Sequence, residues 1–129
     1  MANVENPFIA QLRAVCLAFP EAYEQETWDA PTFRVREKIF VKAGYDERHC
    51  VAWVKARTGV QEMLISADSV HFFVPPYLGS RGWVGINLHN APDWGEVADL
   101  VDESYRLVAP KTLIEQLDAV PIGASNGEE

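Results

Sequence analysis

Residues 32–56 alternate apolar and polar side chains in three successive segments, and no other feature restricts the possible folds as much. The segments are rich in Val, Ile, Phe and Trp and cover Thr32–Arg36, Lys38–Ala43 and Cys50–Ala56. Successive side chains of a strand point to opposite faces, so each segment is expected to bury one face only. Turn-forming residues separate the segments, which predicts antiparallel strands. Glu24–Trp28 is predicted to be a further, shorter strand.

Helical periodicity lies on both sides of this strand region. Apolar residues recur every three or four positions over residues 7–18 and again over residues 94–108, which predicts two amphipathic helices. Asn6 and Asp93 stand just before these stretches, and both residue types cap helix N-termini well.

The remaining segments complete the expected order of elements. Thr58 and Gln61 have the spacing of a capping box, which predicts a short helix ending near Ser66. Strands are predicted at Val70–Val74 and Trp83–Leu88, and a last helix from Pro110 to about Leu117. This order is typical of an α+β domain in which helices pack on one face of an antiparallel sheet.

The composition favours one globular domain. The chain has 129 residues, of which 48% are hydrophobic and 23% are charged, and these values argue against disordered and fibrous classes. We expect a single domain over residues 1–129, with its core at about 7–118 and a flexible tail at 119–129.

No apolar run approaches the ~20 residues of a membrane helix. The N-terminus lacks a signal-peptide pattern, and two cysteines form no disulfide framework, so a cytoplasmic location is expected.

Charge is divided unevenly along the chain. The net charge is -8, from 11 basic and 19 acidic residues. The segment from Arg34 to Arg57 is nevertheless positive, because it holds most of the basic residues and only Glu37, Asp46 and Glu47 oppose them.

The strand alternation predicts where these basic residues point. We expect Phe33, Val35, Ile39, Val41, Cys50, Ala52 and Val54 to face the helices. The open face is then expected to carry Arg34, Arg36, Lys38, Phe40, Lys42, Trp53 and Lys55. Basic side chains interleaved with aromatics attract phosphates and stack bases, which predicts a nucleic-acid-binding surface. A solvated sheet face with charged edges explains the same pattern, and the overall acidity opposes phosphate binding.

The sequence contains no motif for catalysis or metal binding. The three histidines are isolated from one another and from Cys-x-x-Cys spacing. A Gly-x-Ser-x-Gly elbow is absent. The loop Gly79–Gly82 has the residue types of a phosphate cradle, but a surface loop explains it more simply. We therefore expect a non-enzymatic domain that needs no cofactor and no metal.

Four stretches between residues 8 and 117 carry a family resemblance. They are Leu17–Ala22 with the acidic stretch up to Trp28, Pro31–Val35 with Lys38–Val41, Arg81–Leu88, and Asp102–Lys111. In this order they resemble the MmcQ/YjbR-like proteins, a family of small bacterial domains. The resemblance implies a saddle-shaped antiparallel sheet, similar to the double wing of a phage transcription factor, and through that fold it implies DNA binding. It also matches the pair Ser104 and Tyr105, and it matches Lys55 to a lysine that often ends the strand after the hairpin. We expect the pair to be structural, because Tyr105 belongs to the buried stripe of its helix and its hydroxyl needs a partner.

Two functions of different classes fit the sequence. One is DNA binding through the open sheet face. The other is a non-catalytic module in which that face, or the loop from Tyr77 to Arg81, binds a protein or a small anionic ligand. The placement of the basic residues discriminates between them, because basic residues that lie beneath helices would leave no surface for DNA.

Overall fold

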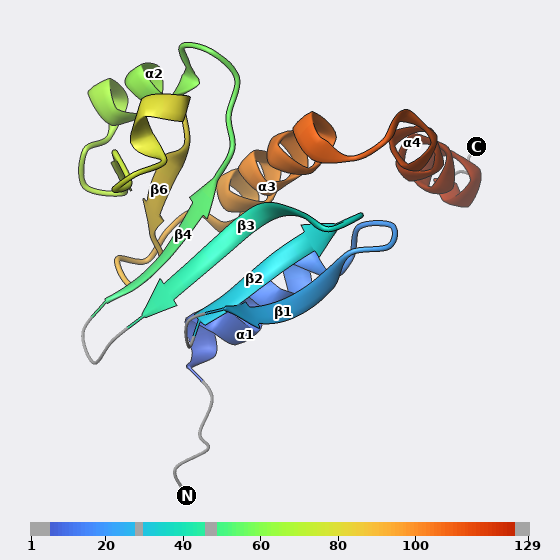
Figure 1. Ribbon diagram of the computed structural model, residues 1–129, viewed down its shortest axis with the longest axis horizontal. Coiled ribbons are helices and arrows are strands. Elements are labelled where there is room, and N and C mark those ends of the chain that lie inside the picture. Colours follow the sequence, from blue (N-terminus) through green and yellow to red (C-terminus); the bar gives the residue numbers. More distant parts are fainter. Residues whose placement is uncertain (1–5, 28–29, 46–48, 126–129) are drawn as a thin grey trace, which may run out of the picture.

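The computed structural model describes residues 6–27, 30–45 and 49–125 (Figure 1). The elements are α1 (Pro7–Cys16), β1 (Tyr23–Thr27), β2 (Ala30–Val35), β3 (Lys38–Tyr45), β4 (Cys50–Val54), α2 (Val60–Ala67), β5 (Phe72–Phe73), the 3-10 helix η1 (Gly79–Arg81), β6 (Val84–Asn87), α3 (Trp94–Val108) and α4 (Lys111–Ser125). The predicted α+β class is therefore confirmed. Trp28 and Arg48 lie outside the described residues.

All the described strands join one open antiparallel sheet. Its order is β1-β2-β3-β4-β6-β5. The first four strands follow one another as hairpins, as expected for segments separated by short turns. The segment with α2 and β5 then intervenes before β6 pairs with β4.

Helices α1 and α3 pack behind the sheet, and the front of β1 to β4 has no helix over it in the described part of the chain (Figure 1). The apolar stripe of α3 is the main contact with the sheet, because Val97, Val101 and Tyr105 are buried against it. The predicted arrangement of helices on one face is thus confirmed.

Strand β3 contains a bulge opposite β2. Phe33 pairs with Val41 and Arg34 pairs with Ile39, so Phe40 has no partner on β2. The extra residue shifts the alternation by one position. As a result Phe40 and Val41 are both fully buried on the helix side, and the half-buried Ile39 takes the open face instead.

The bulge overturns the predicted position of Phe40. This side chain was expected on the open face beside Lys42, but its ring packs edge-on against Tyr105 and Phe19, with centroid distances of 5.3 and 6.1 Å. It belongs to the core and is not available to stack on a base. The predicted inward positions of Phe33, Val35 and Val41 are confirmed, and that of Ile39 is wrong.

Ser104 on α3 bonds to the backbone at the bulge. Its hydroxyl donates to the Phe40 carbonyl oxygen at 2.6 Å and accepts from the Lys55 backbone N–H at 2.9 Å. Ser104 is fully buried, so these two bonds satisfy groups that water does not reach. The next residue, Tyr105, donates its hydroxyl to the Pro20 carbonyl oxygen at 2.7 Å. Both residues of the pair therefore have structural partners, as expected.

The helix ends agree with the sequence in part. Asn6 and Asp93 cap α1 and α3 through their side chains, as expected. The predicted capping box at α2 does not form: Gly59 is the cap, and Gln61 instead donates to the Gly79 and Trp83 carbonyl oxygens. A bond between distant segments replaces the local one.

Helix α4 continues to Ser125, past its predicted end, so much of the predicted tail is helical.

Candidate nucleic-acid interface

One row of paired residues crosses the whole sheet. Its successive pairs are Gln25–Thr32, Thr32–Lys42, Lys42–Trp53, Trp53–Gly85 and Gly85–Phe73. Directly paired residues of antiparallel strands lie on the same face. The row alternates with the buried residues Phe33, Val41 and Val54, so it lies on the face opposite α1 and α3.

A cation–aromatic contact forms the centre of this row. The ammonium nitrogen of Lys42 lies 5.2 Å from the centroid of the Trp53 ring. Both side chains are half-buried. Such a contact contributes about 0.5–1 kcal/mol at an exposed site. It holds a positive charge and an aromatic plane side by side on the open face.

Phe73 extends the aromatic part of the row across Gly85. A Cβ atom built on Gly85 would stand only 2.3 Å from the Phe73 ring, so the ring occupies the space that a side chain would need. A glycine within a strand often marks such a close approach. That glycine was the available sequence signal for Phe73, which the sequence-based prediction of the site did not include.

The indole N–H of Trp53 is buried and has no acceptor among the described residues. A buried donor without an acceptor costs about 1–3 kcal/mol. Replacing Trp53 by Phe removes this donor and keeps an aromatic ring. The substitution therefore distinguishes the contribution of the ring from that of the indole N–H.

Arg34 lies beside the row with its charge uncompensated. Its Nε donates to Thr32 Oγ1 and its Nη2 donates to Thr27 Oγ1, both at 3.1 Å. Both acceptors are neutral hydroxyls, and the described residues include no carboxylate paired with this guanidinium. The side chain is therefore held in place while it keeps a full positive charge.

The turn between β2 and β3 carries Arg36 and Lys38 away from the row. Arg36 and Glu37 have φ angles of 49° and 70°, the left-handed conformation of two-residue hairpin turns. Arg36 forms an exposed two-bond ion pair with Glu21, at 2.7 and 3.3 Å. These hydrogen bonds hold the pKa of Glu21 below its usual value and raise that of Arg36. Arg36 therefore already has a carboxylate partner within the protein.

Of the seven predicted site residues, the structure places Arg34, Lys42 and Trp53 on the open face. The half-buried Lys55 follows two positions after Trp53, just past the end of β4, and the strand alternation predicts the same face for it. Arg36 and the exposed Lys38 are at the turn, and Phe40 is in the core. We call Arg34, Lys42, Trp53, Lys55 and Phe73 the basic–aromatic face.

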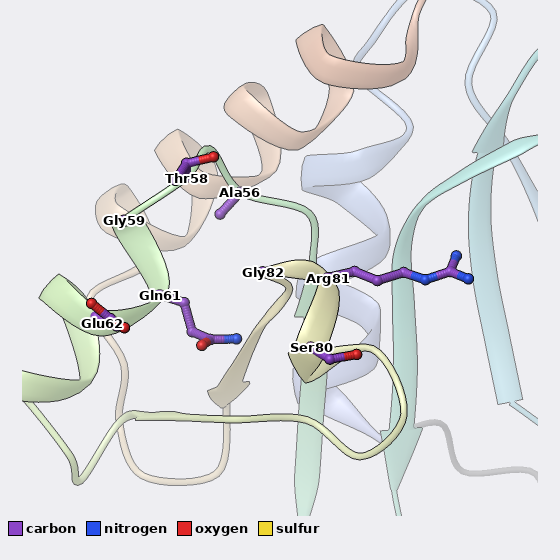
Figure 2. Close-up of a pocket in the computed structure, with 8 residues that line it drawn as sticks. All are labelled: Ala56, Thr58, Gly59, Gln61, Glu62, Ser80, Arg81 and Gly82. Atoms are coloured by element: carbon purple, nitrogen blue, oxygen red, sulfur yellow. The ribbon is translucent and has the colours of Figure 1, made fainter.

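A hollow of about 380 Å³ lies near the end of β4, between the start of α2 and η1 (Figure 2). Gln61, Glu62, Ser80 and Arg81 are among the residues that line it. Figure 2 shows the guanidinium of Arg81 directed away from Gln61 and Glu62. The hollow therefore combines a carboxylate with an outward-pointing cation, which is a poor arrangement for holding an anion inside it.

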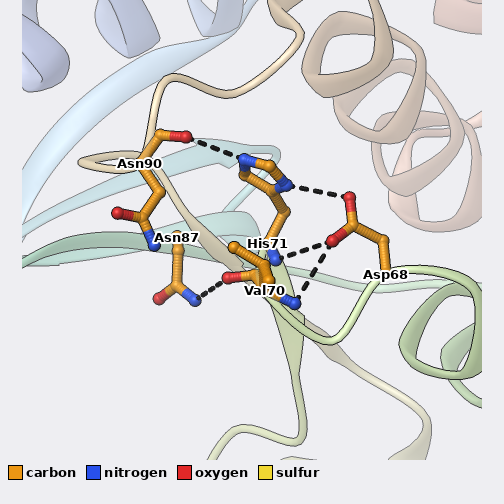
Figure 3. A network of polar contacts seen from close by, with 5 residues as sticks. All are labelled: Asp68, Val70, His71, Asn87 and Asn90. Atoms are coloured by element: carbon orange, nitrogen blue, oxygen red, sulfur yellow. Dashed lines mark hydrogen bonds and ion pairs between the residues drawn. The ribbon is translucent and has the colours of Figure 1, made fainter.

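A polar network ties the segment after α2 to the end of β6 (Figure 3). Asp68 accepts hydrogen bonds from the backbone N–H groups of Val70 and His71. Its other oxygen lies 2.8 Å from His71 Nδ1, and His71 Nε2 lies 2.7 Å from the Asn90 carbonyl oxygen. Both ring nitrogens therefore face acceptors, an arrangement that only the doubly protonated, charged ring satisfies. The network is a structural link between these two segments.

This link is expected to make stability depend on pH. The Asn90 carbonyl and Asp68 raise the pKa of His71 above its usual 6.5, and His71 lowers that of Asp68. The stabilisation from His71 is fully present below its unfolded pKa and is lost as the pH rises through the raised folded value. That from Asp68 is lost as the pH falls through its lowered value. Melting temperatures of the wild type and His71→Gln should differ most between the titrations of Asp68 and His71, and the difference should shrink as the pH rises above 6.5. A constant difference would contradict the assignment.

The described residues contain no group of three or more His, Cys, Asp or Glu side chains placed to hold a metal ion. None of their helices combines the length and apolar character needed to cross a membrane.

Comparison with known proteins agrees with this architecture. A sequence model of the YjbR family matches residues 17–107. The crystal structure of protein DR2400 from Deinococcus radiodurans, which carries a DUF419 domain, is similar with a TM-score of 0.72 and 20% identity. The similarity covers 89% of this chain and 92% of that chain, and at this identity it shows the fold alone. No curated protein matches the sequence. The family match covers well over half of the chain, and the chain therefore belongs to the YjbR family.

Proposed function

We propose that this protein is a non-enzymatic DNA-binding domain that contacts DNA through the basic–aromatic face. The observation that carries the proposal is the Lys42–Trp53 contact on a sheet face that no described helix covers. Arg34 beside it keeps a charge that only neutral hydroxyls contact. Lysine and arginine bind phosphates, and aromatic rings stack on bases.

The charge distribution supports contact through this face only. The whole chain has a net charge of -8, which disfavours phosphates at its acidic surfaces. Attraction is then confined to the segment that is locally positive, and the expected affinity is modest. The predicted contribution of Phe40 is withdrawn, and Arg36 contributes little because Glu21 already binds it.

The proposed location is a reducing bacterial cytoplasm. Cys16 and Cys50 are buried and are not joined in a disulfide. Burial raises the pKa of the Cys50 thiol to about 11 and raises that of Cys16 further. Both side chains therefore act as apolar core residues and not as nucleophiles.

Fluorescence anisotropy of a labelled DNA duplex tests the proposal. If Arg34, Lys42 and Lys55 each neutralise one phosphate, the logarithm of the binding constant should fall with the logarithm of the salt concentration with a slope of about -2.7. This slope corresponds to a roughly 40-fold loss of affinity between 50 and 200 mM salt. The double variant Lys42→Ala/Lys55→Ala should reduce the magnitude of this slope by about 1.8. It should weaken binding to all duplex sequences alike.

Two control variants sharpen this measurement. Lys111→Ala removes an exposed lysine at the start of α4 and should bind as the wild type does. Arg36→Ala should also remain close to the wild type, because its charge is already paired with Glu21. Unchanged affinity in the Lys42/Lys55 double variant would reject the assigned face. No binding of the wild type at 50 mM salt would reject DNA binding and favour an interaction module for a protein or a small anion.

A further inference from the structure

Tyr77 is the most exposed large hydrophobic residue described in this protein. Its side chain is 93% exposed, and its φ angle is 66°. A left-handed backbone is uncommon for a non-glycine residue and costs of the order of 1 kcal/mol or more. The exposure of the ring adds nothing to the stability of the fold, so it needs an explanation outside it.

The loop that carries Tyr77 is held in one conformation by its own backbone. The Leu78 N–H donates to the Pro76 carbonyl at 2.6 Å, which closes a three-residue turn with Tyr77 at its centre. The Gly79 N–H donates to the Pro75 carbonyl at 2.9 Å. Two prolines restrict the approach to this turn. Tyrosine is therefore presented on a rigid support, which lowers the entropy lost when a partner binds.

The base of the loop is attached to α2. Gln61 donates to the Gly79 and Trp83 carbonyl oxygens at 2.8 and 2.7 Å. A Cβ atom on Gly79 would lie 2.3 Å from the Val74 side chain, so the two ends of the loop are in close contact. These contacts fix the position of Tyr77 relative to β5 and β6.

An uncompensated cation accompanies the exposed ring. Arg81 is exposed and makes no ion pair in the described part of the chain. Its guanidinium points outward from the hollow near α2 (Figure 2). Arg81 follows Tyr77 by four positions, so their Cα atoms are at most about 14 Å apart. An aromatic side chain and an arginine at such a separation are a combination that binds nucleotides, since the ring stacks on a base and the guanidinium pairs with a phosphate.

The loop begins where the basic–aromatic face ends. Phe73 is the last residue of the row that contains Lys42 and Trp53. Tyr77 follows four positions later, so its Cα lies at most about 14 Å from that of Phe73. A strand bound along the row could therefore continue to Tyr77.

We propose that Tyr77 stacks on an unpaired base, with Arg81 on an adjacent phosphate, so that the nucleic acid bound by this protein is single-stranded at the loop. This inference rests on the proposed function and names the form of nucleic acid that it takes. Bases within a duplex are covered by their neighbours, whereas an unpaired base offers a ring face to tyrosine. A single strand also has a lower charge density than a duplex, which suits an acidic protein.

The test compares two labelled probes at 50 mM salt, a blunt duplex and the same duplex with a single-stranded extension that contains 2-aminopurine. The wild type should bind the extended probe about tenfold more tightly, the usual magnitude for one stacked base, and should quench the 2-aminopurine fluorescence. Tyr77→Gly should lose both the tenfold preference and the quenching. Tyr77→Phe should keep both. Met63→Ala, which truncates another exposed apolar side chain, should behave as the wild type.

The glycine variant also controls for folding, because glycine adopts the backbone conformation at residue 77 without strain. Its melting temperature should equal or exceed that of the wild type. If Tyr77→Gly keeps the preference and the quenching, the stacking role is wrong while DNA binding through the sheet stands, and the loop is better explained as a protein contact. If the wild type binds neither probe, the proposed function and this inference both fail.

Discussion

Replacing Ser104 by Ala is expected to destabilise the protein by about 3 kcal/mol, since it leaves two buried backbone groups without partners at about 1–3 kcal/mol each. The hydroxyl bonds to the Phe40 carbonyl on β3 and to the Lys55 N–H just past the end of β4. Water does not replace it, because Ser104 is fully buried. The loss amounts to a decrease in melting temperature of about 10 °C for a domain of this size.

Urea denaturation of the wild type and Ser104→Ala checks this value. Ser66→Ala is the matched control, because Ser66 is exposed on α2, and it should change stability by less than about 0.5 kcal/mol. A loss below about 1 kcal/mol for Ser104→Ala would mean that the bulge relaxes and finds other partners.

Replacing Gly85 by Ala is expected to cost a similar amount, about 3 kcal/mol. The added methyl group would stand 2.3 Å from the Phe73 ring. Strand β6 pairs with β4 on one side and β5 on the other, so its backbone has little room to move. The Phe73 ring must leave its place, which also removes it from the basic–aromatic face.

A double-mutant cycle separates this clash from other effects. Gly85→Ala in a Phe73→Ala background should cost less than about 1 kcal/mol, because the obstructing ring is absent. Gly44→Ala is the matched control: its Cβ would meet only the Val51 side chain, at 3.5 Å, an ordinary contact. If Gly85→Ala costs the same with and without the Phe73 ring, the ring is not the cause.

The elements of this fold were largely predictable because each has a long, regular pattern. The stripe of α3 and the alternation of β2 and β4 follow directly from their residues. The bulge in β3 was not predicted, although Ile39, Phe40 and Val41 are three apolar residues in succession and interrupt the alternation. A strict period of two assigns the wrong face to one end of such a strand.

The candidate site was predictable only where strands are regular. Lys42 and Trp53 were placed correctly on the open face because both follow the alternation of their strands. The pairing of Arg36 with Glu21 depends on two left-handed turns that bring distant segments together, and no local pattern indicates it. Gln61 likewise does not cap α2 as expected. It donates instead to carbonyl oxygens of a distant segment, which only the folded chain brings close to it.

The bulge makes the length of β3, and not only its composition, a requirement of this fold. A chain lacking one residue there would form a regular hairpin, yet it would lose the ring that packs on Tyr105 and the carbonyl that Ser104 binds. The inserted residue therefore adds a hydrogen bond between α3 and β3 to the contacts that join these two layers. Relatives that differ in length should accommodate insertions in their loops and conserve the residue count between the β2–β3 turn and the end of β3.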